Sequence, residues 1–149
     1  MTTFIHTAFA KVRTIPDGLL VLTARLGIAA YFLRAGQTKV DGFELTSGAR
    51  YLFAEEYKVP LLPPDVAAWM AVGAEHIFPM LLVLGLATRL SALGLLGMTA
   101  VIQLFVYPAS WPDHLLWTAA LLLIAARGPG WLALDTPLCR KLCKPTPKL

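Results

Sequence analysis

Charged residues are scarce in this chain of 149 residues. Asp, Glu, Lys and Arg make up 15% of it, against about 25% in a soluble domain, whereas 57% of the residues are hydrophobic. We therefore expect an integral membrane protein. Four spans of about 20 residues would use roughly 80 residues, which leaves no room for a separate soluble catalytic domain. The net charge of +4 does not indicate a nucleic-acid partner, because most basic residues flank the apolar runs.

Cysteine is almost absent, and so are the common catalytic motifs. Cys139 and Cys143 lie in the C-terminal tail with a C-x-x-x-C spacing, which is not that of a C-x-x-C redox motif. We expect ordinary reduced thiols there, with palmitoylation as the alternative. The chain also lacks a Gly-rich phosphate loop, a nucleophile elbow and a tight metal-ligand spacing. We therefore expect no metal site.

Apolar runs of membrane-spanning length are what the sequence does contain. They predict an all-α fold, a four-helix transmembrane bundle. The spans are expected at about 18–36, 66–86, 90–107 and 112–126. The last run is short, and its assignment depends on Trp111, Trp117 and Trp131 as interfacial anchors. We expect one membrane domain over 1–135 and a cytoplasmic tail over 136–149.

Two further segments are amphipathic. Residues 1–16 carry apolar residues at helical spacing among basic ones, which predicts an N-terminal interfacial helix. Residues 40–64, between the first two spans, mix Tyr51 and Phe53 with acidic residues such as Glu55. This mixture predicts an outer amphipathic cap over the mouth of the bundle.

Basic residues are distributed unevenly between the two sides of the bundle. Eight of the 13 Lys and Arg fall in the N-terminal segment, the turn between the second and third spans, and the tail. Residues 39–65 hold three, against five acidic residues. Because cytoplasmic loops carry the excess of Lys and Arg, we expect both termini in the cytoplasm of a bacterium and residues 40–64 outside its inner membrane.

Two charged residues are expected near the middle of the membrane, where each costs about 3 kcal/mol or more unless it is paired. Arg25 lies about seven residues into the first span, and Glu75 about nine residues into the second from the opposite side. Small residues on the Glu75 face permit close approach of the helices. We predict an ion pair between Arg25 and Glu75. It either fixes the helix register or belongs to a functional site.

Pro79 adds polar groups beside Glu75. A proline has no N–H, so the carbonyl of Glu75 loses its helical donor and the second span should kink there. The adjacent His76 would place an imidazole in the same turn. His76 is either a candidate binding residue or a histidine that bonds a neighbouring carbonyl.

A second polar group gathers toward the outer ends of the spans. Lys39 follows the first span on the Arg25 face, Gln103 and Tyr107 end the third span, and His114 begins the fourth. With His76, these residues are candidates for binding a carbonyl-bearing head group such as a quinone. The alternative is that they are ordinary interfacial residues at helix ends.

Several segments resemble the DoxX family of four-span membrane proteins. They are RLGIAAYFLRAGQTK at 25–39, LFAEEYKVPLLPP at 52–64, EH at 75–76, VIQLFVYP at 101–108 and RGPGWLALD at 127–135. The resemblance covers about residues 22–135. It implies a four-helix bundle related to quinone-associated membrane redox subunits. The segments at 52–64 and 101–108 look closest to one subgroup of the family, whose members are often encoded near small secreted metal-binding peptides and their maturation proteins.

Two classes of function follow. In the first, the chain is a redox-associated subunit, an oxidoreductase component that binds a quinone-like or other small cofactor in the outer half of the bundle. In the second, it is a non-catalytic anchor, assembly or export partner in a metal-stress or peptide-maturation system. Both classes need the lipid bilayer and either a protein partner or a second copy of the chain. A four-span bundle with one ion pair would serve either.

Overall fold

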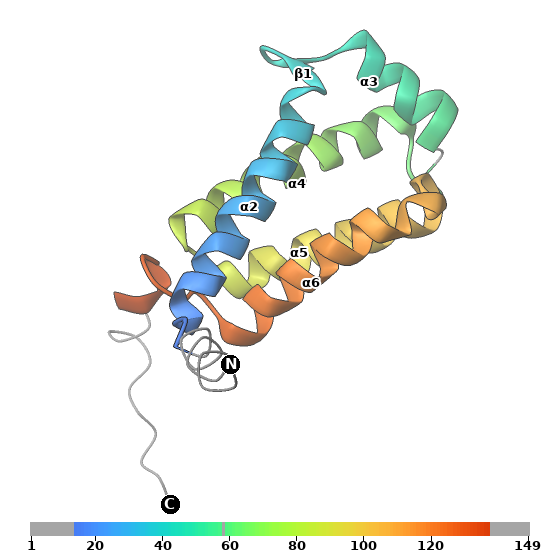
Figure 1. Cartoon of the computed structure of the whole chain (residues 1–149). Coiled ribbons are helices and arrows are strands. Elements are labelled where there is room, and N and C mark those ends of the chain that lie inside the picture. The colour runs from blue at the N-terminus through green and yellow to red at the C-terminus, as the bar shows by residue number, and fades with distance from the viewer. Residues whose placement is uncertain (1–13, 58, 138–149) are drawn as a thin grey trace, which may run out of the picture.

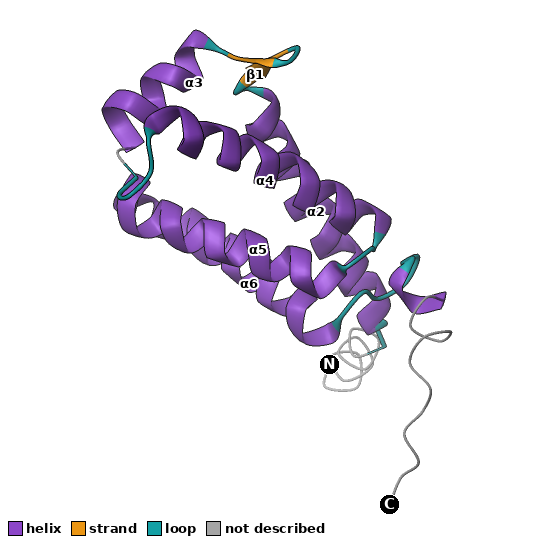
Figure 2. Ribbon diagram, turned by 180° about the vertical axis from the view of Figure 1, so that it is seen from behind, coloured by secondary structure: helices purple, strands orange, loops and turns teal. Residues whose placement is uncertain are grey.

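The computed structural model describes residues 14–57 and 59–137. Long helices dominate it, which confirms the all-α fold class (Figures 1 and 2). They are α2 (Asp17–Gln37), α4 (Pro64–Leu84), α5 (Thr88–Val101), which the π-helix η2 (Ile102–Val106) continues, and α6 (Trp111–Arg127). Helix α2 packs on α4 and α6, and α5 packs on the same two helices. The four helices thus form a four-sided bundle.

Among residues 14–57 and 59–137, three helical segments are long and apolar enough to cross a membrane: Asp17–Gln37, Pro64–Leu84 and Thr88–Val106. Helix α6 has 17 residues, which is at the short end of what a bilayer requires. It nevertheless runs beside α5 along the bundle (Figure 1). Its assignment as a fourth span stays a prediction.

The ends of these helices follow from local sequence. Helix α4 begins with Pro64, whose missing N–H costs nothing in the first turn, and carries Asp65 near the positive end of the helix dipole. It ends at Leu84, and the next residue, Gly85, has a φ of 66°, a left-handed conformation that favours glycine. Pro79 is buried inside α4, which runs as one α-helix through it. The kink at Pro79 stays a prediction.

The connection between α2 and α4 is folded rather than extended. It contains a hairpin of β1 (Val40–Asp41) and β2 (Glu44–Leu45), the helix α3 (Ser47–Tyr51) and the π-helix η1 (Leu52–Tyr57). Leu45 and Phe53 are buried against Ala67, Ala68 and Val72 of α4. The segment therefore packs on α4 at one end of the bundle, and we call this half of the bundle the hairpin half (Figure 1). Its role as an outer amphipathic cap stays a prediction.

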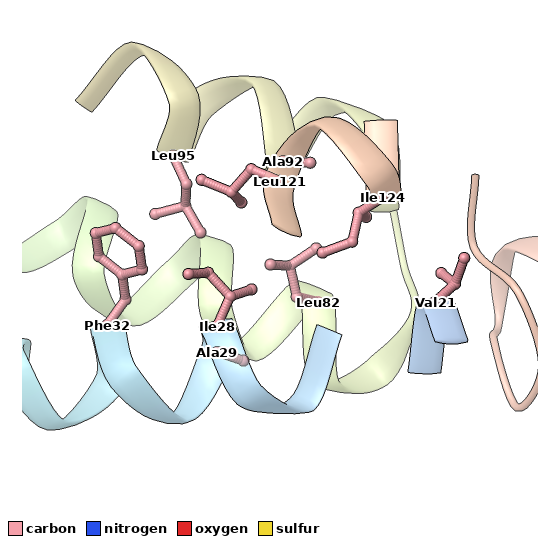
Figure 3. Close-up of a cluster of buried hydrophobic side chains, with 9 residues drawn as sticks. All are labelled: Val21, Ile28, Ala29, Phe32, Leu82, Ala92, Leu95, Leu121 and Ile124. Carbon is pink, nitrogen blue, oxygen red and sulfur yellow. The ribbon is translucent and has the colours of Figure 1, made fainter. Parts of the chain in front are cut away.

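The main hydrophobic core lies in the opposite half of the bundle, which we call the core half. Side chains from all four long helices meet there (Figure 3). They are Val21, Ile28, Ala29, Phe32, Leu82, Ala92, Leu95, Leu121 and Ile124. Close packing of the core half fixes the relative position of the helices. The hairpin half is more open and carries the candidate site.

The predicted interfacial helix over 1–16 falls almost wholly outside the described residues. Cys139 and Cys143 fall outside them as well.

Candidate functional site

Glu75 pairs with Lys39, not with Arg25. Helix α4 places the Glu75 side chain in the interior of the bundle, where the residue is 3% exposed. The Lys39 Nζ donates to Glu75 Oε1 over 2.8 Å and to the carbonyl of Ala35 over 3.1 Å. Lys39 lies just beyond the end of α2, and its long side chain turns back along the helix. The prediction that Lys39 lies on the Arg25 face is consistent with this contact, since Arg25 is buried as well.

Arg25 has quite different partners. Its guanidinium is fully buried and donates to two carbonyls at the end of α4, Leu82 over 2.8 Å and Val83 over 3.1 Å. It also donates to the carbonyls of Pro129 over 2.6 Å and Trp131 over 3.1 Å, in the loop after α6. Arg25 therefore ties three segments of the chain together in the core half.

The predicted ion pair between Arg25 and Glu75 is wrong, and the reason is the axial offset of the helices. Leu82 lies seven residues beyond Glu75, about 10 Å along the helix axis. The last carbonyls of a helix have no partner within the helix, so they are good acceptors for a buried guanidinium. Arg25 meets these carbonyls at the end of α4 rather than the carboxylate in its middle.

A cavity of about 460 Å³ occupies the hairpin half, with walls from α2, α4, α5 with η2, and α6. Its volume falls in the range of sites that hold small organic molecules. The polar residues in its wall are Tyr31, Lys39, Tyr57, Glu75, Tyr107, Ser110, Asp113 and His114. Most other lining residues are apolar. The cavity therefore suits a largely apolar molecule with a few polar atoms.

The space exists because one face of α4 carries small side chains. Ala67, Ala71 and Ala74 all line the cavity, and their spacing of four and three residues puts them on one side of the helix. Ala35 of α2 lines it as well. Larger side chains fill the core half, whereas these alanines leave the hairpin half partly empty.

Aromatic contacts bridge the elements around the cavity. Trp117 of α6 lies 4.6 Å from Tyr31 and 4.8 Å from His114, measured between ring centroids. In the hairpin half, the rings of Tyr57 and Tyr107 are 5.4 Å apart and their hydroxyls are 3.5 Å apart. Burial and the hydrogen bond with Tyr107 raise the pKa of Tyr57 well above its usual value. The Tyr57 hydroxyl is therefore neutral and available as a donor.

His114 is held in one orientation by Gln103. The amide Nε2 of Gln103 donates to the carbonyl of Pro108 over 2.9 Å, which leaves its Oε1 toward His114 Nδ1 at 2.6 Å. Since Oε1 only accepts, His114 Nδ1 carries the hydrogen, and Nε2 of a neutral ring is then an acceptor. His114 lines the cavity, and Gln103 acts as its support.

Gln103 and His114 also line a shallower hollow of about 540 Å³ on the other side of α5 and α6. Its lining residues come almost entirely from these two helices. A hollow between two adjacent helices faces the surroundings of the bundle rather than its interior. The cavity between all the long helices is the better candidate site.

His76 lies away from the cavity. Its Nδ1 is 2.8 Å from the carbonyl of Val72, one turn earlier in α4. Its ring packs on Gly36 so closely that a Cβ built on that glycine would lie 2.7 Å from His76 Cε1. Of the two interpretations of His76 given by the sequence, the structure favours the histidine that bonds a neighbouring carbonyl.

Of the candidate binding residues, the structure brings Lys39, Tyr107 and His114 to one cavity, together with Glu75. Sequence reasoning missed Tyr57 and assigned Trp117 only an anchoring role. The position of Trp117, three residues after His114 on the same helix face, was a signal that could have placed it at the site.

Within residues 14–57 and 59–137, no three His, Cys, Asp or Glu side chains come close enough to hold a metal ion. The cavity wall offers hydrogen-bonding groups, aromatic surfaces and the ion pair of Lys39 with Glu75. These groups can bind and orient an organic head group.

Comparison with known proteins agrees with the helical architecture. The model of the DoxX family matches residues 20–108. An uncharacterised protein of Haemophilus influenzae is 30% identical over 134 residues, which cover 85% of this chain and 87% of that protein. No solved structure matches the chain. With the family model matching more than half of its length, the chain belongs to the DoxX family.

Proposed function

We propose that this DoxX protein binds a quinone-like or other small redox compound in the cavity of its hairpin half, as a subunit of a membrane redox system. The observation that carries the proposal is the cavity of about 460 Å³, whose mostly apolar wall includes Lys39, Glu75 and His114. We place the protein in the bacterial inner membrane, with the hairpin half toward the outside.

The wall fits the two parts of such a compound. Trp117 and Tyr31 offer aromatic faces to a planar ring. The Tyr57 hydroxyl, the Lys39 ammonium and the His114 imidazole offer hydrogen bonds to polar atoms on that ring. This combination of a large apolar surface with a few fixed polar groups is typical of small-molecule sites.

Two side chains of the cavity wall are also exposed on the outside of the bundle. Met70 of α4 and Val101 of α5 both line it, and they are 59% and 39% exposed. A compound dissolved in the lipid could therefore enter between α4 and α5. This route suits molecules that partition into membranes.

The test is to purify the protein in mild detergent and identify bound compounds by mass spectrometry and absorbance. The variants to compare are His114→Phe and His76→Phe, since phenylalanine keeps the ring volume and removes the nitrogens. We expect His114→Phe to lose most of the retained compound and His76→Phe to keep it, because His114 lines the cavity and His76 does not.

Thermal stability of both variants serves as the control for folding. Equal retention in the two variants would contradict the assignment of His114. No compound in the parent protein, together with no binding of an added quinone or of its reduced hydroquinone, would end the redox proposal. The chain would then be better described as an anchor, assembly or export partner.

A further inference from the structure

One oxygen of the Glu75 carboxylate has no partner. Oε1 accepts from Lys39, whereas Oε2 is buried and has no hydrogen bond within the described residues. The Glu75 side chain is 4% exposed and belongs to the cavity wall. A buried charged oxygen without a donor is costly, so the site is incomplete as the chain alone forms it.

Lys39 presents the complementary group. A lysine ammonium carries three hydrogens, and within the described residues Lys39 gives two of them, to Glu75 Oε1 and to the carbonyl of Ala35. Lys39 also lines the cavity. Within the described residues, the pair therefore leaves one acceptor, Glu75 Oε2, without a donor and one hydrogen of Lys39 without an acceptor, beside the cavity that both residues line.

We infer that the occupant carries a hydroxyl group that donates to Glu75 Oε2 and accepts from Lys39. The site accordingly selects phenols and related hydroxylated head groups over ethers and compounds that have only carbonyls. This inference rests on the proposed function. For a quinone-like compound, it means that the reduced, hydroxyl-bearing form binds best.

Other head groups satisfy the pair less well. A carbonyl oxygen accepts from Lys39 but leaves Glu75 Oε2 without a donor. A quaternary ammonium group has no N–H for Oε2 and is repelled by Lys39. A hydroxyl is the smallest group that both donates and accepts, and a phenol also places its ring against the aromatic wall.

The experiment compares a para-alkylphenol with its O-methyl ether, which has the same alkyl chain and lacks only the donor hydrogen. Both are titrated onto the purified protein in mild detergent by calorimetry. We expect the phenol to bind at least about tenfold more tightly, because a hydrogen bond to a charged group is stronger than a neutral one.

The double variant Lys39→Met with Glu75→Leu removes both charges together, so neither is left unpaired. We expect it to bind both probes with similar affinity. The matched control is Glu55→Gln, which changes an exposed carboxylate outside the cavity wall and should keep the tenfold preference.

Equal affinities in the unaltered protein would overturn the inference and leave the cavity as a binding site. A preference for the phenol that persists in the double variant would also overturn it, since the donor would then be recognised elsewhere. If neither probe nor any quinone binds, the proposed function fails as well.

Discussion

Lys39 and Glu75 depend on each other more than most ion pairs do. Their side chains are 13% and 4% exposed, so water screens them poorly. Removing one partner leaves a buried charge, whereas removing both leaves none. The stability of the fold should therefore respond very differently to single and double substitutions.

We expect Glu75→Leu alone or Lys39→Met alone to lower the free energy of unfolding by about 3 kcal/mol. The double variant should recover most of this loss, since the coupling energy of residues in contact is of similar size. Thermal or denaturant unfolding in mild detergent, performed as a double-mutant cycle, measures the coupling.

A second double-mutant cycle, between Arg25 and Glu75, serves as the comparison for the cycle between Lys39 and Glu75. Arg25→Met removes the guanidinium donor from four carbonyl oxygens that are buried or partly buried, and it should be strongly destabilising. Combining it with Glu75→Leu should give additive losses, because the two residues share no partner in the structure. Recovery in that combination would mean that Arg25, and not Lys39, is the partner of Glu75.

At the scale of secondary-structure elements, the start of α5 depends on a residue far along the chain. The residue before this helix, Ala87, has a φ of 47° and no side chain that can cap. Instead, the carboxylate of Asp135 accepts from the N–H groups of Ala87 and Thr88, each over 2.8 Å. The segment 127–135 thus closes the core half by binding Arg25 through its carbonyls and α5 through Asp135.

This cap should make stability depend on pH in the acid range. Burial raises the pKa of Asp135. The hydrogen bonds from Thr88 and Ala87 and the charge of Arg25 outweigh this effect, so the pKa of Asp135 lies below its ordinary value. A depressed pKa means that the cap contributes fully above the ordinary value of 3.8 and is lost as the pH falls through the folded-state pKa.

We expect Asp135→Ala to lower the free energy of unfolding by about 1 kcal/mol at neutral pH, the usual cost of losing a helix cap. The difference from the unaltered protein should shrink when the pH is well below 3.8, since the parent carboxyl is then protonated. The control is Asp113→Ala, which removes an acidic residue from the first turn of another helix, α6. A difference independent of pH would contradict the role of the Asp135 charge.

At the scale of the whole molecule, the positions of the helices in the sequence were predictable. The displacement of one helix along the axis of another was not. The runs predicted at 18–36 and 66–86 agree with α2 and α4 within two residues at each end. Hydropathy marks such runs because the bilayer sets their length. Periodicity also identified Glu75 as an interior charge. It does not predict how far one helix is displaced along the axis of another, and this displacement decides which cation reaches Glu75.

The sequence predicted a binding site in the outer half of the bundle, but the shape of the cavity was out of reach of sequence reasoning for a related reason. It depends on what Ala67, Ala71 and Ala74 leave unfilled opposite α5 and α6, and this is a property of the assembled bundle. The partners of Arg25 are backbone carbonyls, which any residue provides. Side-chain identity therefore predicted that a polar site exists, and only the packed helices show which residues share it.

Our prediction of the orientation in the membrane rests on charges that the fold gathers at one end. Arg127 forms an ion pair with Asp17, so the start of α2 and the end of α6 lie together. The side chain of Arg89, in the first turn of α5, lies beside Gly128 at the same end. We expect this basic end in the cytoplasm and the hairpin half outside. Reporter fusions after Leu149 and at Gly42, in the exposed hairpin turn, should show a cytoplasmic C-terminus and an external hairpin. The reverse result would place the cavity toward the cytoplasm and would contradict the positive-inside assignment.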